Sequence, residues 1–513
     1  MFDRKKDDKK KKGLNVTPIL FAVFLIAICG IIYELIIGAI SSYLMGNSVK
    51  QYSITIGLFM SAMGVGSILS KKIDKDLFDK FVVIELSLGI LGGFSAFLLL
   101  YSYAYTEFYK LAMYFCILGI GMLVGLEIPI LTRMIEDSES DLKSTIANVL
   151  SFDYIGALIG SLAFPLILLP SLGQLKTSFL VGIINVIVAV ILIIFYKKEI
   201  KNYKILKFIS VSVLILLIGF FVTGDAISRG IENNLYRDRV IHSSQSKYQK
   251  IVTTKHKDDL RLFLDGNIQF SSKDEYRYHE SLIHPALSLA KKRDRVLVLG
   301  GGDGLALREI LKYKDVKEIV LVDIDSEMLE YCKTDPLISK LNGGSLENNR
   351  VKVIAGDGYK YLEENKNPYD VIIIDFPDPN NESLNKLYTN IFYRLVWNNL
   401  TDEGIATVQS TSPLEARRAF WCINRTIKSE NFYVEPYTVH VPSFGGWGFN
   451  MFSKKKFNHD NIDINVSTKF LSNENFEGLF AFGKDESDSN EIRINTLTDP
   501  ILIGYYEEAV NGM

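Results

Sequence analysis

Long apolar runs with few charged residues fill the first part of the chain and stop near residue 225. Each is close to the roughly 20 apolar residues that an α-helix needs to cross a 30 Å hydrocarbon core. Soluble domains rarely contain several such runs. The pattern predicts seven membrane-spanning helices, at residues 17–40, 51–70, 82–103, 110–132, 150–171, 177–196 and 206–222. The first run is too long for a secretory signal peptide.

Lysines gather in alternate connections between the predicted spans. The N-terminal segment MFDRKKDDKKKK is rich in basic residues, and two later connections carry Lys71, Lys72, Lys75 and Lys80, and Lys197, Lys198, Lys201 and Lys204. The positive-inside rule assigns such loops to the cytoplasm. Seven crossings from a cytoplasmic N-terminus then place everything after Gly224 outside.

Acidic residues lie within or at the edge of three spans, at Glu34, Glu127 and Asp153. A carboxylate at membrane depth is costly, so a buried functional or pairing role is one interpretation. The alternative is that these acids cap helix ends at the interface or pair with neighbouring Tyr and Ser side chains.

After residue 225 the pattern changes to short apolar strands separated by polar turns and helices. Residues 239–270 predict several strands with turns at Lys257–Asp259 and Asp265–Gly266, and a helix is expected from near Ser272 to Leu289. A βαβ series follows, with strands at 295–304, 318–325, 351–358 and 370–379 and helices at 305–313, 326–333 and 359–365. Buried strands alternating with helices predict a doubly wound, mainly parallel sheet.

The predicted fold class is therefore a multi-pass α-helical membrane domain followed by an α/β Rossmann-like domain of methyltransferase type, with a small β domain between them. The expected boundaries are 1–225 for the membrane domain, 226–271 for the β domain and 272–513 for the Rossmann-like domain.

Composition narrows the function classes. The 57 basic and 59 acidic residues give a net charge of −2, which disfavours a nucleic-acid binder. Four widely spaced cysteines without a CxxC pair disfavour a disulfide framework or a structural zinc site.

The segment GGGDG at 300–304 follows one strand and opens a helix, so its backbone can approach a ligand closely. The dinucleotide pattern GxGxxG fails at its third glycine, where Leu305 stands, and Asp303 places an anion where a pyrophosphate would lie. Asp323 ends the second strand, where an acid commonly accepts hydrogen bonds from ribose hydroxyls. Asp357 ends the third strand and suits an adenine amino group. Together these residues favour a nucleoside sulfonium over NAD.

The fourth strand ends in Asp375-Phe-Pro-Asp378, so with Asp303 three carboxylates are expected around one cleft. Any one acid after a strand can be an ordinary turn or helix cap, but acids at successive strand ends favour a site. Such a cluster binds either a metal or a polyamine. Metal is the weaker interpretation, because no histidine lies at ligand spacing in these motifs.

At this point the chain resembles the spermidine synthase (polyamine aminopropyltransferase) family, from about Tyr248 to Asn399 and more weakly to Phe452. The motifs that carry the resemblance, in the family's order, are KYQKIV, LFLDGNIQFSSKDEYRYHESLIHPAL, VLVLGGGDG, VDID, AGDGYKYL and DFPDP. Family members with a multi-span N-terminal half are known, and YTNIFYRLVWNNL and VPSFGGWGF resemble that branch.

For the donor, the resemblance implies contacts to decarboxylated S-adenosylmethionine, or to its product methylthioadenosine. Gln249 would contact the nucleoside, Asp323 its ribose, and Asp357 and Gly358 its adenine. It implies no permanently bound cofactor and no metal.

For the acceptor, the resemblance implies that His279 and Asp303, assisted by Tyr278, hold the amine end of the polyamine or aminopropyl group. Asp375 would be the general base and Asp378 a second anchor for a diamine, with putrescine the expected acceptor and spermidine the product. The implied partners are these small molecules, the lipid bilayer and a second copy of the chain through the catalytic domain.

The chain departs from the family pattern in two places. After Asp378-Pro379 the usual Gly-Pro-Ala segment is replaced by NNESLNK, and a later tyrosine hydroxyl is replaced near Phe444. These departures leave the amine acceptor open. Two other functions stay open as well: an S-adenosylmethionine-dependent methyltransferase, and a polyamine transporter or sensor in which Glu34 and Glu127 handle cations and the soluble half only binds.

The predicted cell-membrane location contains a conflict over sides. A donor made in the cytosol favours a cytoplasmic catalytic domain, which we expect, whereas seven spans and the positive-inside rule favour the opposite face. The conflict disappears if one run is not a full crossing, and 150–171, with Pro165 and Pro170, and 206–222 are the candidates.

Overall fold

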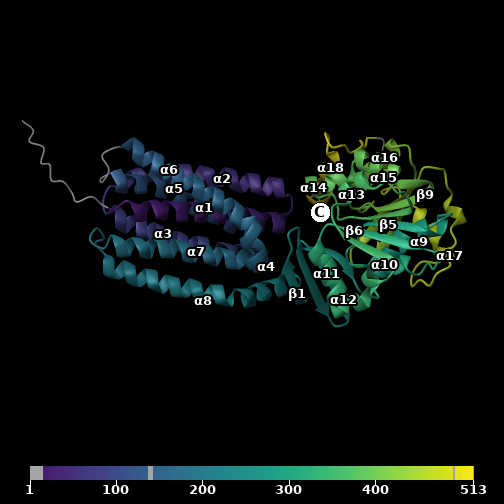
Figure 1. Ribbon diagram of the computed structural model, residues 1–513, viewed down its shortest axis with the longest axis horizontal. Coiled ribbons are helices and arrows are strands. Elements are labelled where there is room, and N and C mark those ends of the chain that lie inside the picture. The colour runs from purple at the N-terminus through teal and green to yellow at the C-terminus, as the bar shows by residue number, and fades with distance from the viewer. Residues whose placement is uncertain (1–14, 137–141, 489–490, 512–513) are drawn as a thin grey trace, which may run out of the picture. The chain divides into compact units, whose positions relative to one another are not determined.

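The computed structural model describes residues 15–136, 142–488 and 491–511, which divide into one unit ending at Val240 and another beginning at Ile241. Unit 1 is a bundle of long helices (Figure 1). Its α-helices are α1 Thr17–Met45, α2 Ser48–Leu69, α3 Leu77–Gly93, α4 Ser95–Tyr105, α5 Tyr109–Glu136, α6 Leu142–Ala163, α7 Leu169–Phe195 and α8 Tyr203–Leu235.

Six helical runs of the described residues are long and apolar enough to cross a membrane. Five of them each contain one predicted span, with α3 and α4 forming a single run over Leu77–Tyr105. The run Lys143–Phe195 is 53 residues long and contains 150–171 and all but the last residue of 177–196. At 1.5 Å per residue it is far too long for one crossing. It is interrupted at Gly173, whose φ of 69° and ψ of −179° are not helical.

Contacts with α1 show that the chain reverses direction within this run. Cβ atoms added at Gly156 and Gly160 of α6 would lie 2.5 Å from Phe24 O and 2.9 Å from Ile28 O, so α6 runs parallel to α1. In α7 the order is opposite, because Cys29 of α1 faces Val181 whereas the Tyr196 hydroxyl donates to Asn15 O. Both predicted spans therefore traverse the bundle, in opposite directions.

The remaining helix ends can be assigned to two ends of unit 1. At the first end, defined by residues 70–79 and 196–203, Arg133 donates to Ser70 O and Ile73 O at 2.9 Å, and the Asp79 carboxylate accepts from the backbone N–H groups of Lys201 and Asn202. At the second end, defined by residues 41–48, 104–109 and 234–236, the polar contacts are Tyr43 to Tyr236, Tyr109 to Ser41, and Asn234 to Ala104 O. In the described part of the chain, seven segments thus alternate between the two ends.

Helix α8 does not stop at residue 225, where the membrane domain was expected to end, but continues to Leu235. The apolar pattern marks where lipid-compatible residues end, and the polar residues that follow contain no proline that would stop a helix.

One of the acids expected at membrane depth lies in a buried polar cluster of unit 1. Glu127 is 1% exposed and lies beside Glu85, a fully buried acid inside the predicted span 82–103. The Asn185 amide donates to Glu85 Oε2 at 2.9 Å and accepts from the Tyr33 hydroxyl at 3.0 Å. The other two acids, Glu34 and Asp153, are only half-buried.

Unit 2 contains two sheets. The first is an antiparallel sheet in which four strands follow one another in chain order, β1 Arg239–Gln245, β2 Lys250–His256, β3 Asp259–Leu264 and β4 Asn267–Ser271. Its hairpins turn at the two predicted places. Helix α9, Glu275–Leu289, follows as expected. The second sheet has the order β10-β11-β9-β8-β5-β6-β7, formed by β5 Arg295–Gly300, β6 Glu318–Asp323, β7 Val351–Ala355, β8 Tyr369–Asp375, β9 Leu400–Gln409, β10 Tyr433–Val441 and β11 Gly445–Ser453.

Helices cover both faces of this seven-stranded sheet (Figure 1). Successive strand residues alternate between faces: Val296 and Val298 join the core beneath α9 and α10, whereas Leu297 and Leu299 join the core beneath α15 and α16. The helices of the sheet domain are α10 Leu305–Ile310, α11 Ser326–Thr334, α12 Pro336–Leu341, α13 Gly358–Glu364, α14 Glu382–Asn385, α15 Asn390–Asn399, α16 Arg417–Ser429, α17 Asn473–Phe476 and α18 Ile501–Asn511.

The parallel strands confirm the predicted Rossmann-like, doubly wound sheet. From β5 the chain builds outward to β6 and β7, then returns to add β8 and β9 on the other side of β5. The order therefore reverses between β5 and β8, where ligands bind in open α/β sheets. Gly300 and Asp375 pair across this point, and a Cβ added at Gly300 would lie 2.1 Å from Asp375 O.

Close packing of α2 against α5 gives a test of unit 1. A Cβ at Gly66 would lie 2.1 Å from Met122 O, whereas a Cβ at Gly64 meets nothing within 4 Å. We expect Gly66→Val to lower the thermal unfolding temperature of the detergent-purified protein by several degrees, because backbone atoms cannot move aside as a side chain can. Gly64→Val on the same helix is the matched control, and equal effects of the two variants would contradict the packing.

Candidate active site

The predicted amine-binding residues come together at the reversal between β5 and β8. Asp375 ends β8, and the Tyr278 hydroxyl of α9 donates to its Oδ1 at 2.5 Å. Removal from water raises the pKa of Asp375 to about 6; the charge of Asp303 adds to the rise, while His279 and the Tyr278 hydrogen bond oppose it. The carboxyl therefore binds a proton more readily than an exposed aspartate does.

His279 is buried and positively charged at neutral pH. Its Nδ1 lies 2.9 Å from Glu275 Oε2, and Arg308 donates to both oxygens of Glu275 at 2.9 and 2.8 Å. Burial alone would lower the pKa of His279, but the hydrogen bond to Glu275 and the charges of Asp303 and Asp375 outweigh it and raise the pKa to about 9. The imidazolium thus offsets part of the negative charge of the nearby aspartates.

Asp303 follows the glycine loop and is also buried. Its Oδ1 accepts from the Leu305 backbone N–H at 2.9 Å, which fixes the first turn of α10. Burial raises the pKa of Asp303, and the charge of His279 opposes the rise. The predicted capping role and the predicted site role of this residue are therefore compatible.

Asp378 is held by residues that the sequence did not single out. Tyr506 of α18 donates to its Oδ2 at 3.0 Å, and the Gln409 amide lies 3.5 Å from its Oδ1. The same amide hydrogen-bonds the Tyr388 hydroxyl at 2.8 Å. Burial raises the pKa of Asp378 to about 6, against these hydrogen bonds. Tyr506 lies 128 residues after Asp378, and no motif marks it.

The predicted nucleoside residues lie along the neighbouring strand ends. Asp323 accepts from the backbone N–H groups of Gly302 and Asp325, at 3.1 and 2.9 Å, and burial raises its pKa to about 6. Gln249 reaches this region from the small sheet, where its amide donates to Asp325 Oδ2 at 2.9 Å. The structure thus brings Gln249 and Asp323 together through Asp325, which the sequence did not identify.

Asp357 and Gly358 begin α13 at the end of β7. Asp357 caps the helix by accepting from the Tyr359 N–H at 2.8 Å, and its second oxygen pairs with Lys386 Nζ at 2.7 Å. Burial would raise the pKa of Asp357, but Lys386 and the capping bond lower it. Lys386 belongs to NNESLNK, the segment that departs from the family pattern. An adenine amino group at Asp357 would share the carboxylate with this lysine.

Aromatic rings surround Tyr278, whose hydroxyl binds Asp375. The Tyr278 ring centroid lies 6.0 Å from that of Phe444 and 6.5 Å from that of Trp447. The indole N–H of Trp447 is buried without a hydrogen-bond partner among the described residues. No group of three or more His, Cys, Asp or Glu side chains in the described part of the chain is arranged to hold a metal ion.

Comparisons with known proteins identify the family. The spermine/spermidine synthase domain model matches residues 275–464. A polyamine aminopropyltransferase of Oceanobacillus iheyensis is 44% identical over 492 residues, which cover 94% of this chain and 96% of the relative. The chain belongs to the polyamine aminopropyltransferase family. An aminopropyltransferase of Leptospira interrogans is also 44% identical, over 495 residues that cover 96% of this chain and 99% of the relative.

These aminopropyltransferases match nearly the full chain, so unit 1 is part of the resemblance and the predicted branch is confirmed. The protein is a polyamine aminopropyltransferase, and the comparisons give no support to a methyltransferase or a polyamine transporter or sensor. The crystal structure of spermidine synthase from Thermotoga maritima is 28% identical, covers 48% of this chain and 84% of that chain, and aligns with a TM-score of 0.44.

The raised pKa of Asp375 predicts the pH dependence of this aminopropyltransferase. Below pH of about 6, Asp375 and Asp378 gain protons and lose the charge that attracts an amine, so kcat/KM for the amine should fall there. Tyr278→Phe removes a hydrogen bond that favours the charged form, so the acidic limb should move to higher pH. Tyr433→Phe, at an exposed position, is the control. An acidic limb that stays in place in Tyr278→Phe would contradict the assignment.

Proposed function

We propose that this enzyme transfers the aminopropyl group of decarboxylated S-adenosylmethionine to a diamine, putrescine in the first place, giving spermidine and S-methyl-5'-thioadenosine. The observation that carries the proposal is Asp375 at the strand-order reversal, hydrogen-bonded to Tyr278 and close to the charges of His279 and Asp303. Anionic side chains beside aromatic rings suit a dication with an apolar middle.

The reaction needs a neutral amine. Its nitrogen attacks the carbon attached to the sulfonium, the C–S bond breaks, and its electron pair stays on sulfur as a thioether. The attacking nitrogen ends with one proton too many, which passes to Asp375 directly or through water. An amine near pKa ~10 and an ordinary carboxylate near ~4 differ by about 6 units, roughly 8 kcal/mol. Because the pKa of Asp375 is raised to about 6, the pKa difference between the amine and this carboxyl narrows to about 4 units, roughly 5 kcal/mol.

The other residues position the two substrates in this proposal. Asp378, with Tyr506 and Gln409, anchors the far ammonium of the diamine, and Asp303 with His279 holds the aminopropyl amine. Asp323 and Gln249 take the ribose side of the donor, and Asp357 and Gly358 take the adenine. Most of the catalytic effect then comes from alignment of nucleophile and leaving group and from exclusion of water.

Release of methylthioadenosine from labelled decarboxylated S-adenosylmethionine and putrescine tests these roles. We expect Asp375→Asn to slow release roughly 10²- to 10⁴-fold, because a proton acceptor is lost. Asp378→Ala should raise the KM of putrescine more than that of the donor. The control Asp402→Asn, at a carboxylate 86% exposed, should leave the release rate and the KM of putrescine unchanged. If Asp378→Ala changed only the KM of the donor, the role of Asp378 as an anchor of the acceptor would be contradicted. Full activity of Asp375→Asn would exclude Asp375 as the general base.

We also propose that unit 1 is inserted in the cell membrane. Phe208, Ile215 and Val222 lie seven residues apart on α8 and are 74%, 66% and 71% exposed, as expected for a lipid-facing stripe. Eight lysines gather at the first end, namely Lys71, Lys72, Lys75, Lys80, Lys197, Lys198, Lys201 and Lys204. The positive-inside rule then supports a cytoplasmic first end.

With seven alternating segments, this orientation brings the chain out of α8 on the outer face, opposite to the cytoplasmic side that the origin of the donor favours. The two expectations exclude each other, and the lysine distribution together with the segment directions supports the outer face. Fusions of alkaline phosphatase, which is active only outside, should be active after Met513 and inactive after Lys75. Activity after Lys75 and none after Met513 would instead support a cytoplasmic catalytic unit. Equal activity of the two fusions would contradict seven crossings.

A further inference from the structure

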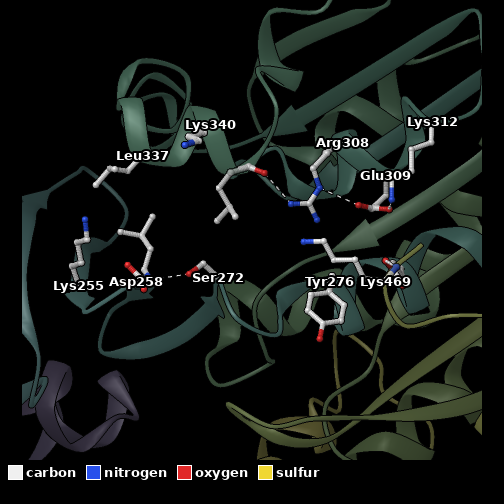
Figure 2. Close-up of a pocket in the computed structure, with 13 residues that line it drawn as sticks. Lys255, Asp258, Ser272, Tyr276, Arg308, Glu309, Lys312, Leu337, Lys340 and Lys469 are labelled. Atoms are coloured by element: carbon white, nitrogen blue, oxygen red, sulfur yellow. Dashed lines mark hydrogen bonds and ion pairs between the residues drawn. The ribbon is translucent and has the colours of Figure 1, made fainter. Parts of the chain in front are cut away.

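A cavity of about 600 Å³ in unit 2 lies apart from the aspartate site (Figure 2). Helix α9 contributes Tyr276 and Glu280 to it, and Tyr278 points to the other side of the same helix, since it lies two positions, or about 200°, from Tyr276. The β2–β3 hairpin, α10, α12 and Lys469 form the other walls.

The buried carboxylates of this cavity already have hydrogen-bond or ion-pair partners. Glu280 accepts three hydrogen bonds from the backbone N–H groups of Lys469, Phe470 and Leu471, at 2.6, 2.9 and 2.9 Å. Glu309 is bound by His284 and Arg308, each at 3.0 Å, and by Lys312. Neither acid is therefore free to pair with a further cation.

Three lysines of the lining lack such a partner. Lys255, Lys340 and Lys469 are exposed and form no ion pair with any described residue, and Asp258 is the one exposed acid of the lining. Lys469 Nζ lies 5.2 Å from the centre of the Tyr276 ring, and Figure 2 shows its amine and the Arg308 guanidinium extending into the same opening. The cavity thus keeps an excess of positive charge over an aromatic surface.

The size and walls of the cavity define the ligand class. Its volume is that of a site for a small molecule, whereas a protein partner would need a broad contact area. Leu260, Leu337 and Leu341 add an apolar wall to the cavity. A ligand with a phosphate group and a flat ring would satisfy both parts, and planar guanidinium and lysine amines are the usual phosphate ligands.

We propose that this cavity is a binding site for a phosphate-bearing small molecule of nucleotide size, separate from the aminopropyl transfer site. The phosphate contacts Lys340 and Lys469, and the ring packs on Tyr276 and the leucine wall. The site is independent of which amine the enzyme uses.

Calorimetric titration of the full-length protein in detergent with inorganic pyrophosphate and with GDP tests the proposal. We chose a guanine nucleotide so that the probe does not imitate the adenine of the donor. We expect saturable one-to-one binding, tighter for GDP than for pyrophosphate. The double variant Lys340→Ala/Lys469→Ala should weaken both roughly tenfold, because two positive charges near the phosphate are lost.

The double variant Lys360→Ala/Lys366→Ala, at exposed lysines of unit 2 outside the cavity, is the matched control and should bind as the native protein does. Asp375→Asn should also bind the probes normally, so failure of the proposed catalytic base would not affect this result. Absence of saturable binding at millimolar concentration, equal weakening by both lysine pairs, or loss of binding in Asp375→Asn would each overturn the site.

Discussion

Negative charge held away from water is the constraint on which the catalytic unit depends. Burial raises the pKa values of Asp303, Asp375 and Asp378, because each carboxylate has lost its contact with water. The fold supplies compensating positive charge through His279. That imidazolium is stable because the Glu275 carboxylate binds it, and Arg308 in turn fixes the position of Glu275. In the proposed reaction a cationic substrate completes the neutralisation, so affinity for an amine comes from the buried charges together rather than from any single contact.

The parts predicted from sequence are those with local signals. Alternating apolar residues and turn residues at Lys257 and Gly266 located the strands, and the aspartates after each strand followed from the geometry of parallel sheets. Asp325, Gln409 and Tyr506 were missed because they act through tertiary contacts without a motif. The departure at NNESLNK had a chemical result that spacing alone could not supply, the ion pair between Lys386 and Asp357.

In unit 1, too, local sequence signals predicted the elements but not their tertiary contacts. Hydropathy located every long apolar helical segment of unit 1, but not the direction of α6, which only its contacts with α1 establish. Hydropathy also concealed Glu85, because one acid hardly changes the average of a long apolar run, and it ended α8 too early. Helix packing depends on small residues such as Gly66 and Gly125, whose absent side chains let two backbones meet.

In the proposed membrane orientation, the reversal at Gly173 makes the number of crossings odd. Parity then decides the side on which the chain continues, whatever the individual helices do. Loss of the α6–α7 pair would keep the catalytic unit on its side, whereas loss of α6 alone would move it across the bilayer with its fold intact. Under this proposal Gly173, a residue of unit 1, determines which pool of amines the catalytic unit meets.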